Sequence, residues 1–371
     1  MSEINVNCQK KRIEWIDIAK LLGIYIVLVA HNSIDMKWLN IFISFTSQAF
    51  FFLAAVTTTN KSIKIDIQKS VRTILVPYCC FFIFGYLFWW LPVEFLRNPQ
   101  VWDRSIKELL LKPFVGLLLG NPSYTSFSTM VNWPLWFLLT LFWLKVIDSL
   151  VSAIKNEKLI IAINILFVIL SIYITQNGNL GVITFVKRSV FYTAIQIYPA
   201  FILGKLFKKY LLPKMKDESL SFKKIVIIFV ELIVSVAILL LKVFIDGKMG
   251  CHNGVYLEGV SWPLAWMGTI SGIWAVISLS RIIHHVPSFI AFLAKNTICI
   301  FGFHSIINGY LLVLVDKLFK TNFKEYMPLY VSLIYAIVLM LLCMIPCVLV
   351  LKFAPWMLSG SKTNKRITNG K

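Results

Sequence analysis

Residues 12–33 read Arg12-Ile-Glu-Trp-Ile-Asp17-Ile-Ala-Lys20-Leu-Leu-Gly23-Ile-Tyr25-Ile-Val-Leu-Val-Ala-His31-Asn32-Ser33. From Leu21 to Ala30 the stretch holds only Leu, Gly, Ile, Tyr, Val and Ala, which is typical of a membrane helix. Lys20 precedes His31 by eleven positions, and eleven steps bring a helix round to within roughly 20° of its starting direction. The two side chains therefore share one stripe, about 16 Å apart along the axis.

Ionisable groups on one face of a membrane helix are costly to bury and indicate a functional site. In the alternative interpretation, both residues mark the ends of an ordinary span. Lys20 then reaches the inner interface as a topogenic charge, and His31 lies among the outer headgroups.

The composition of the whole chain indicates a polytopic membrane protein. Of 371 residues, 58% are hydrophobic and only 15% are charged, against about a quarter charged in soluble domains. Apolar runs of about 18 to 25 residues recur, each long enough to cross a bilayer. The net charge of +20 is spread over short segments between these runs, which favours a role in topology over nucleic-acid binding.

These runs predict an all-α integral membrane protein, a polytopic bundle of about ten transmembrane helices. The spans are expected at 15–34, 39–59, 73–96, 134–154, 158–176, 189–207, 223–245, 260–281, 296–316 and 327–353. With the N-terminus inside, 24 Lys and Arg fall in inner segments and 11 in outer ones, so both termini are predicted to be cytoplasmic. Residues 1–358 form one transmembrane domain, and 359–371 form a short disordered cytoplasmic tail.

Two further features bound the fold. Within the outer connection 97–133, the apolar run 108–119 is too short to span and predicts a re-entrant or interfacial segment, followed by a stretch rich in hydroxyl groups at 121–129. The seven cysteines form no CxxC or Cys/His cluster, so neither disulfides nor a metal site is expected.

Four segments share their motifs and their order with one protein family. They are Asp17, Lys20, Gly23 and His31; Lys69-Ser-Val-Arg72-Thr-Ile-Leu-Val-Pro77-Tyr78; Trp133-Pro134-Leu135-Trp136-Phe137-Leu138; and Leu293-Ala294-Lys295-Asn296-Thr297 followed by His304. Together they resemble the acyltransferase-3 family of integral membrane proteins, which modify glycans. The chain departs from the family pattern where Phe52-Leu53-Ala54-Ala55-Val56 replaces Phe-Leu-Ser-Gly-Tyr, and where Ala294 replaces a glycine.

The resemblance implies a membrane O-acyltransferase of the bacterial inner membrane. It would transfer an acyl group, acetyl by preference, from acyl-CoA to a hydroxyl of a cell-surface glycan such as capsule, exopolysaccharide or O-antigen. Acyl-CoA is then a donor substrate, and no bound cofactor or nucleic acid is expected. A polysaccharide exporter without chemistry is the alternative, but few acidic residues lie mid-span to form its polar path. A solute transporter would need paired broken spans, which the sequence lacks.

The expected catalytic residues are His31, Lys20 and Asp17. Histidine suits a base near neutral pH, so His31 is predicted to be that base or a transient acyl carrier. Lys20 is expected to meet a donor phosphate or the oxyanion, and Asp17, three positions earlier, to hold its ammonium. An extended pantetheine arm is of the same order as the Lys20–His31 separation.

The remaining site residues bind the two substrates. Arg72, together with Lys20, is expected to bind acyl-CoA from the cytoplasm, whereas the 205–224 segment is mostly topogenic. The expected glycan-binding residues are Trp133, Trp136, His304 and Asn296. Interfacial packing of the two tryptophans and an interhelical hydrogen bond of His304 are the structural alternatives.

Overall fold

The computed structural model describes residues 13–32, 41, 44–93, 107–120, 129–177, 190–215, 221–246, 261–283, 286–323 and 325–358. Turns of π or 3-10 type carry the label η. The elements are α1 (Glu14–Ala30), α3 (Thr46–Thr57), α4 (Ile63–Ser70), η1 (Val71–Leu75), α5 (Val76–Gly85), η2 (Tyr86–Trp90), η4 (Lys107–Leu111), α7 (Lys112–Leu119), η5 (Trp133–Leu135), α8 (Trp136–Ser152), α9 (Glu157–Asn177), α11 (Val190–Tyr210), α12 (Leu212–Met215), α13 (Phe222–Asp246), α14 (Trp262–Ile282), α15 (Ser288–Lys295), α16 (Thr297–Phe319), α17 (Leu329–Leu342), α18 (Met344–Phe353) and η6 (Pro355–Met357).

The predicted all-α membrane class is confirmed, since the described residues hold helices and no strand. Eight helices or continuous helix pairs are long and apolar enough to span a membrane. The 17 residues of α1 and the 12 of α3 fall short of that length, and they coincide with the first two predicted spans. The predicted tail 359–371 and the segment 121–128 lie outside the described residues.

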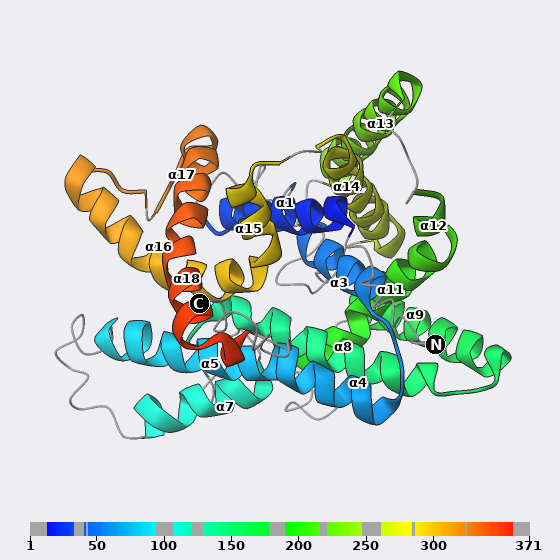
Figure 1. The fold of residues 1–371 in the computed structure, drawn as a ribbon, viewed down its shortest axis with the longest axis horizontal. Coiled ribbons are helices and arrows are strands. Elements are labelled where there is room, and N and C mark those ends of the chain that lie inside the picture. Colours follow the sequence, from blue (N-terminus) through cyan, green and yellow to red (C-terminus); the bar gives the residue numbers. More distant parts are fainter. Residues whose placement is uncertain are drawn as a thin grey trace, which may run out of the picture.

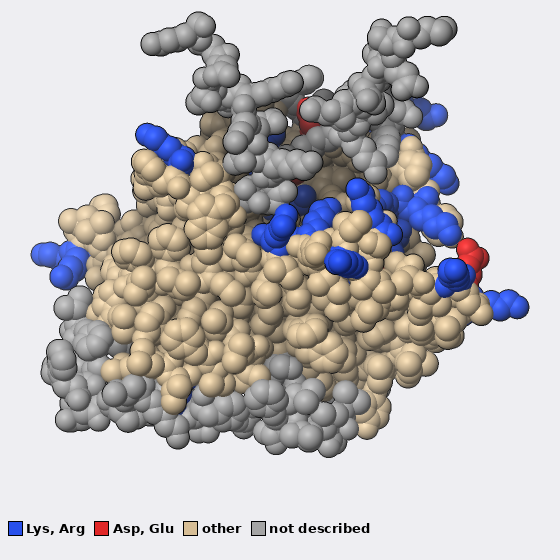
Figure 2. Space-filling model, turned by 60° about the horizontal axis from the view of Figure 1, so that its bottom comes forward, with Lys and Arg blue, Asp and Glu red and all other residues tan. Residues whose placement is uncertain are grey.

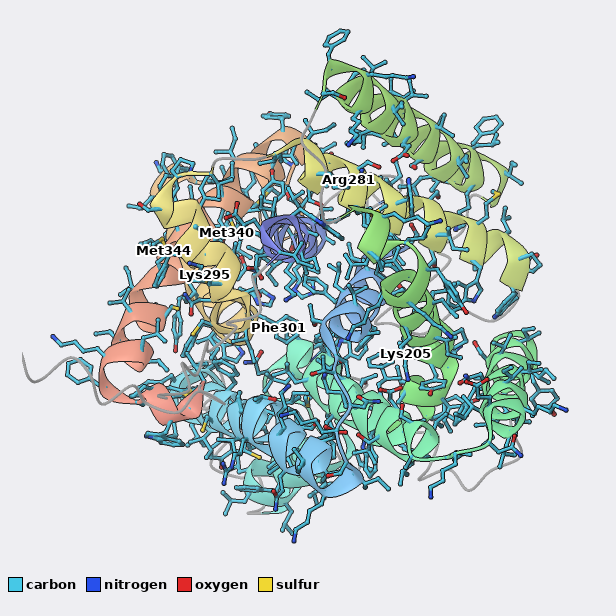
Figure 3. All side chains as sticks on the ribbon, turned by 45° about the vertical axis from the view of Figure 1, so that its right-hand side comes forward. Lys205, Arg281, Lys295, Phe301, Met340 and Met344 are labelled. Atoms are coloured by element: carbon cyan, nitrogen blue, oxygen red, sulfur yellow. The ribbon has the colours of Figure 1, made fainter. Side chains whose placement is uncertain are left out.

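Helix α1 lies in the middle of the bundle. It contacts α3, α14, α15, α16 and α17, and Figure 3 looks along it with these helices arranged around it. The ribbon in Figure 1 places α15 and α14 on either side of α1, with the α16–α18 group beyond α15. Contact on several sides explains why nine of its residues are buried, Asp17 among them.

The third span begins ten residues earlier than the sequence predicts. Helical structure is continuous from Ile63 to Val93, so residues 63–72, expected before the span, are helical. At its start the Asp66 carboxylate accepts the backbone N–H of Lys61 at 3.0 Å, which satisfies a donor near the helix end. The π turn η1 widens the backbone just before Pro77, whose ring and missing N–H disturb a regular helix.

The short apolar run 108–119 is helical, as η4 and α7, and is bound to α5 and η2 by two tyrosines. Tyr78 donates its hydroxyl to the Leu117 carbonyl at 2.5 Å, and Tyr86 donates to the Leu109 carbonyl at 3.1 Å. Gly120 ends the helix in the left-handed region at φ 64°, which a glycine adopts without strain. A short, non-spanning helix is therefore confirmed here, while its depth in the membrane stays a prediction.

Charge is segregated on the surface. Figure 2 shows Lys and Arg gathered along one side, above a broad band of uncharged side chains. Exposed basic residues at the helix ends that successive spans bring to one side include Lys61, Lys64, Lys69, Arg72, Lys155, Lys158, Lys209, Lys214, Lys223 and Lys295. We call this side the basic side. Exposed Lys317 and Lys320 lie at the opposite end of α16.

Helix α13 exposes a run of apolar side chains, among them Phe229, Ile233 and Leu240. Such an apolar face is what a helix presents to lipid, and exposed lysines at the ends of such helices are typical of a membrane interface.

Candidate active site

The site is built on the two ends of α1. Lys20 lies in its first half, and His31 directly follows its last residue, with the His31 backbone N–H bonded to the Val27 carbonyl at 3.0 Å. The helix is unbroken between them, so the predicted separation of about 16 Å along the axis applies.

At the far end of α1, His31 meets His304 of α16. The Nδ1 atom of His31 lies 3.0 Å from the Nε2 atom of His304, and the ring centroids are 5.1 Å apart. His304 is completely buried, whereas His31 is exposed. A substrate can therefore contact His31, whereas His304 lies behind it and contacts only protein. The two histidines are 273 positions apart in the sequence.

The hydrogen bonds of His304 fix where the protons are in the neutral pair. Its Nδ1 atom lies 2.8 Å from the Phe301 carbonyl oxygen and 3.2 Å from that of Ile300. A carbonyl only accepts, so this Nδ1 carries a hydrogen and Nε2 carries the lone pair. His31 must therefore donate its Nδ1–H to His304, which leaves the Nε2 lone pair of His31 available to a substrate.

A second set of polar contacts holds this end of α1 against α17. Asn32 donates its side-chain amide to the Ser332 hydroxyl at 3.0 Å, and Ser332 donates to the Val29 carbonyl at 3.2 Å. Tyr25 donates its hydroxyl to the Leu333 carbonyl at 3.1 Å. These bonds flank His31 in the sequence and restrict its backbone, so the imidazole is held in one place.

At the other end of α1, Lys20 lines a cavity of about 250 Å³, which we call the α1 cavity. The Lys20 ammonium lies 3.7 Å from the Asp17 carboxylate, as the spacing of the two residues predicts. The other lining residues are Ile24, Phe50, Ala54, Thr57, Thr73, Ile74, Phe137, Leu138, Leu141, Lys145, Thr297, Ile298 and Phe301.

One wall residue of the α1 cavity also packs against the histidine pair. Phe301, labelled in Figure 3, belongs to the cavity wall, and its ring centroid lies 5.9 Å from that of His304. The cavity is therefore amphipathic, with ammonium groups at Lys20 and Lys145 and a mostly apolar remainder of the wall that includes Phe301. This arrangement suits an elongated ligand with an anionic end.

Lys145 is the site residue that the sequence analysis missed, since it was treated as an inner topogenic charge. It lines the α1 cavity, and its ammonium donates to the Thr58 hydroxyl at 2.8 Å. The signal was a single lysine within the apolar helix α8, three positions before the buried Asp148. An ionisable residue inside a membrane helix indicates a functional site, and this argument applies to Lys145 as it does to Lys20.

The remaining predicted residues are spread over the molecule. Arg72 is exposed on η1 and is absent from the described wall of the α1 cavity, although Thr73 and Ile74 belong to it. Trp133 is 42% exposed, whereas Trp136 is 8% exposed and its ring lies 6.4 Å from that of Phe51.

Asn296 immediately precedes α16 and donates its amide to the Phe292 carbonyl at 2.8 Å. That bond joins the end of α15 to the start of α16, a structural role. The glycan-binding roles of Trp133, Trp136 and Asn296 stay predictions, as does that of His304, which the structure places completely buried behind His31.

Comparison with known proteins adds one finding. The family model of the acyltransferase-3 type, described as an acyltransferase domain, matches residues 13–351. Neither a curated protein nor a solved structure matches the chain.

Proposed function

Because the chain belongs to the acyltransferase-3 family, we propose that it transfers an acyl group from acyl-CoA to a hydroxyl of a cell-surface glycan, with His31 as the base. We further propose that the acyl group is acetyl and that the protein resides in a bacterial inner membrane with both termini cytoplasmic. The family assignment itself makes the protein a membrane acyltransferase, which disfavours the exporter that the sequence left open.

The observation that carries the proposal is the oriented histidine pair. In the proposed reaction the His31 Nε2 lone pair removes the proton of the acceptor hydroxyl as its oxygen attacks the thioester carbonyl. The tetrahedral intermediate then collapses, the carbon–sulfur bond breaks, and the protonated His31 returns the proton to the departing thiolate. His304 accepts the Nδ1–H of His31 throughout and stabilises the transient imidazolium.

In this proposal Lys20 binds a part of acyl-CoA that lies away from the thioester. Its distance from His31 along α1, about 16 Å, puts it out of reach of a carbonyl attacked at His31, so we assign it to anionic groups of acyl-CoA rather than to the oxyanion. Asp17 keeps the ammonium in place.

The test uses surface polysaccharide from cells that carry the wild-type gene, no gene, or the His31→Gln variant. The expected result is an O-acyl content in His31→Gln cells equal to that of cells without the gene, with unchanged protein in the membrane. General base assistance is worth about 10²–10⁴-fold, so the loss is readily measured. Normal acylation by His31→Gln would overturn the proposal, because glutamine serves equally well as a mere boundary residue.

The same variant series separates a base from an acyl carrier. Both roles use the same nitrogen, but only the carrier forms an acyl-imidazole. Mass spectrometry of protein quenched with acid after mixing with acyl-CoA detects that adduct on His31 in the carrier mechanism, and we expect none.

A further inference from the structure

A second polar pocket, of about 360 Å³, opens beside the α1 cavity. Its wall comes from the end of α3 and the residues that follow, from α8, and from the last turns of α11. The lining residues are Ala55, Thr58, Thr59, Asn60, Asp148, Lys205, Lys208 and Lys209. We call it the lysine pocket; Lys205 is labelled in Figure 3.

The lysine pocket and the α1 cavity share a wall. Thr57 lines the α1 cavity and Thr58 lines the lysine pocket, so the last turn of α3 separates the two. Lys145, from the α1 cavity, donates to the hydroxyl of Thr58 at 2.8 Å. Lys145 of the α1 cavity therefore contacts a residue that lines the lysine pocket.

The lysine pocket has a surplus of positive charge. Its described wall holds three lysines and one carboxylate, that of Asp148. This carboxylate is buried and already paired, since Lys205 forms an ion pair with it and Asn60 donates to it at 2.8 Å. Because the negative charge is compensated inside the wall, an incoming anion meets the ammonium groups of Lys208 and Lys209.

Contacts that stabilise the fold account for two of the three lysines in the lysine pocket. Lys205 joins α11 to α8 through Asp148, and Lys208 donates to the Thr58 carbonyl at the C-terminal end of α3. Both are ordinary stabilising contacts. Lys209 has neither role; it lies 5.2 Å from the ring of its neighbour Tyr210 and adds a further positive charge.

We propose that the lysine pocket binds phosphate groups at the nucleotide end of the acyl donor, with the acyl-bearing arm running through the α1 cavity toward His31. The ammonium groups of Lys208 and Lys209 and the hydroxyl of Thr59 can donate the charge-assisted hydrogen bonds that phosphate oxygens accept, whereas the Asn60 amide and the Thr58 hydroxyl already donate within the protein. The pocket lies on the basic side, and the acyl end must reach His31 at the opposite end of α1. This assignment rests on the proposed function, because it takes a phosphorylated nucleotide thioester as the donor.

The experiment measures binding of adenosine 3′,5′-bisphosphate to the purified full chain in nanodiscs. The test variant is the double substitution Lys208→Gln with Lys209→Gln, which leaves the Asp148–Lys205 pair intact. The control is Lys214→Gln with Lys223→Gln, which removes the same charge from exposed positions of the basic side outside the pocket. We expect the Kd to rise at least about tenfold in the test variant and to stay within about twofold in the control, since the test variant alone loses charge-assisted hydrogen bonds to the phosphate.

Equal affinity of wild type and test variant would overturn the assignment. A membrane lipid could supply the same phosphate chemistry, so the measurement is repeated in zwitterionic nanodiscs and in nanodiscs with phosphatidylglycerol. Retention of that lipid by wild type but not by the test variant in native mass spectrometry, with no bisphosphate binding, would also contradict the nucleotide assignment.

One further variant separates this assignment from the proposed function. His31→Gln is expected to bind the bisphosphate as wild type does, because His31 lies at the far end of α1. Pocket-dependent binding without any acyl transfer by wild type would support the nucleotide site and contradict the proposed reaction. Acyl transfer with a donor KM that the test variant leaves unchanged would contradict the pocket assignment alone.

Discussion

At the scale of single residues, the bond from His304 Nδ1 to the Phe301 carbonyl determines the properties of the pair. It orients His304 so that its lone pair faces His31, and it thereby gives His31 a fixed tautomer. In metal sites, a hydrogen bond from the second ring nitrogen likewise fixes the tautomer and orientation of a histidine. We therefore regard His304 as a positioning residue, which acts on substrate only through His31.

His304→Leu should lower kcat about tenfold to 100-fold, the range seen when the partner of a functional histidine is removed. His304→Gln should retain more activity, because its side-chain oxygen can accept the Nδ1–H of His31. The KM for acyl-CoA should not change in either variant. Steady-state kinetics in nanodiscs measures these values, and equal kcat for the Leu and Gln variants would argue against a positioning role.

Lys20 should affect the donor rather than the chemistry at His31. Lys20→Gln should raise the KM for acyl-CoA about tenfold or more, whereas Lys20→Arg should be milder because the charge remains. Lys295→Gln, at an exposed position of the basic side, serves as the control and should leave the KM unchanged. A normal KM in Lys20→Gln would remove Lys20 from the donor site.

The residues on α1 could be predicted from the sequence, because helical spacing alone relates Asp17, Lys20 and His31. The pairing of His31 with His304 could not, since it depends on how α16 packs against α1 across most of the chain. Lys145 was missed for a similar reason. Its position beside Lys20 follows from the packing of α8, which no local pattern specifies.

At the scale of helices, the approach of α11 to α3 places the lysine pocket. A Cβ atom at Gly204 would overlap the Phe52 carbonyl and the Ala55 side chain, so only glycine permits this contact. The family pattern has a glycine on the second span where this chain has Ala55. In this chain the glycine that permits the close approach is Gly204 on α11, opposite Ala55 of α3.

Gly204→Ala should therefore destabilise the protein, by about 1–3 kcal/mol as in other overpacked sites. The matched control is Leu206→Ala, on the same helix at an exposed position. Thermal unfolding of the purified protein in detergent compares the two. A Tm for Gly204→Ala equal to that of wild type would show that α3 and α11 are not in such close contact.

The positions of helices were predicted better than their ends. Ten apolar runs sufficed to place ten helical segments, because length and hydropathy are set locally. The predicted start of the third span was wrong because Lys64, Lys69 and Arg72 were placed in the connection before it. Exposed lysines at the end of a helix can remain in water, so charge did not mark the boundary.

At the scale of the whole molecule, Lys and Arg collect along one side of the face shown in Figure 2, above a broad uncharged band. Under the positive-inside rule the basic side should face the cytoplasm. A reporter fused after Lys371 should then be active only as a cytoplasmic reporter. Periplasmic activity of that fusion would reverse the orientation and place the lysine pocket on the wrong side for a cytoplasmic donor.

The most direct measurement of the central role of His31 is acyl transfer by purified protein in nanodiscs. Radiolabelled acyl-CoA serves as donor, and surface glycan extracted from a host that lacks the gene serves as acceptor. His31→Ala should lower the transfer rate at least about 100-fold, and added imidazole should restore part of it by replacing the missing base. Transfer by His31→Ala at the wild-type rate would contradict the account.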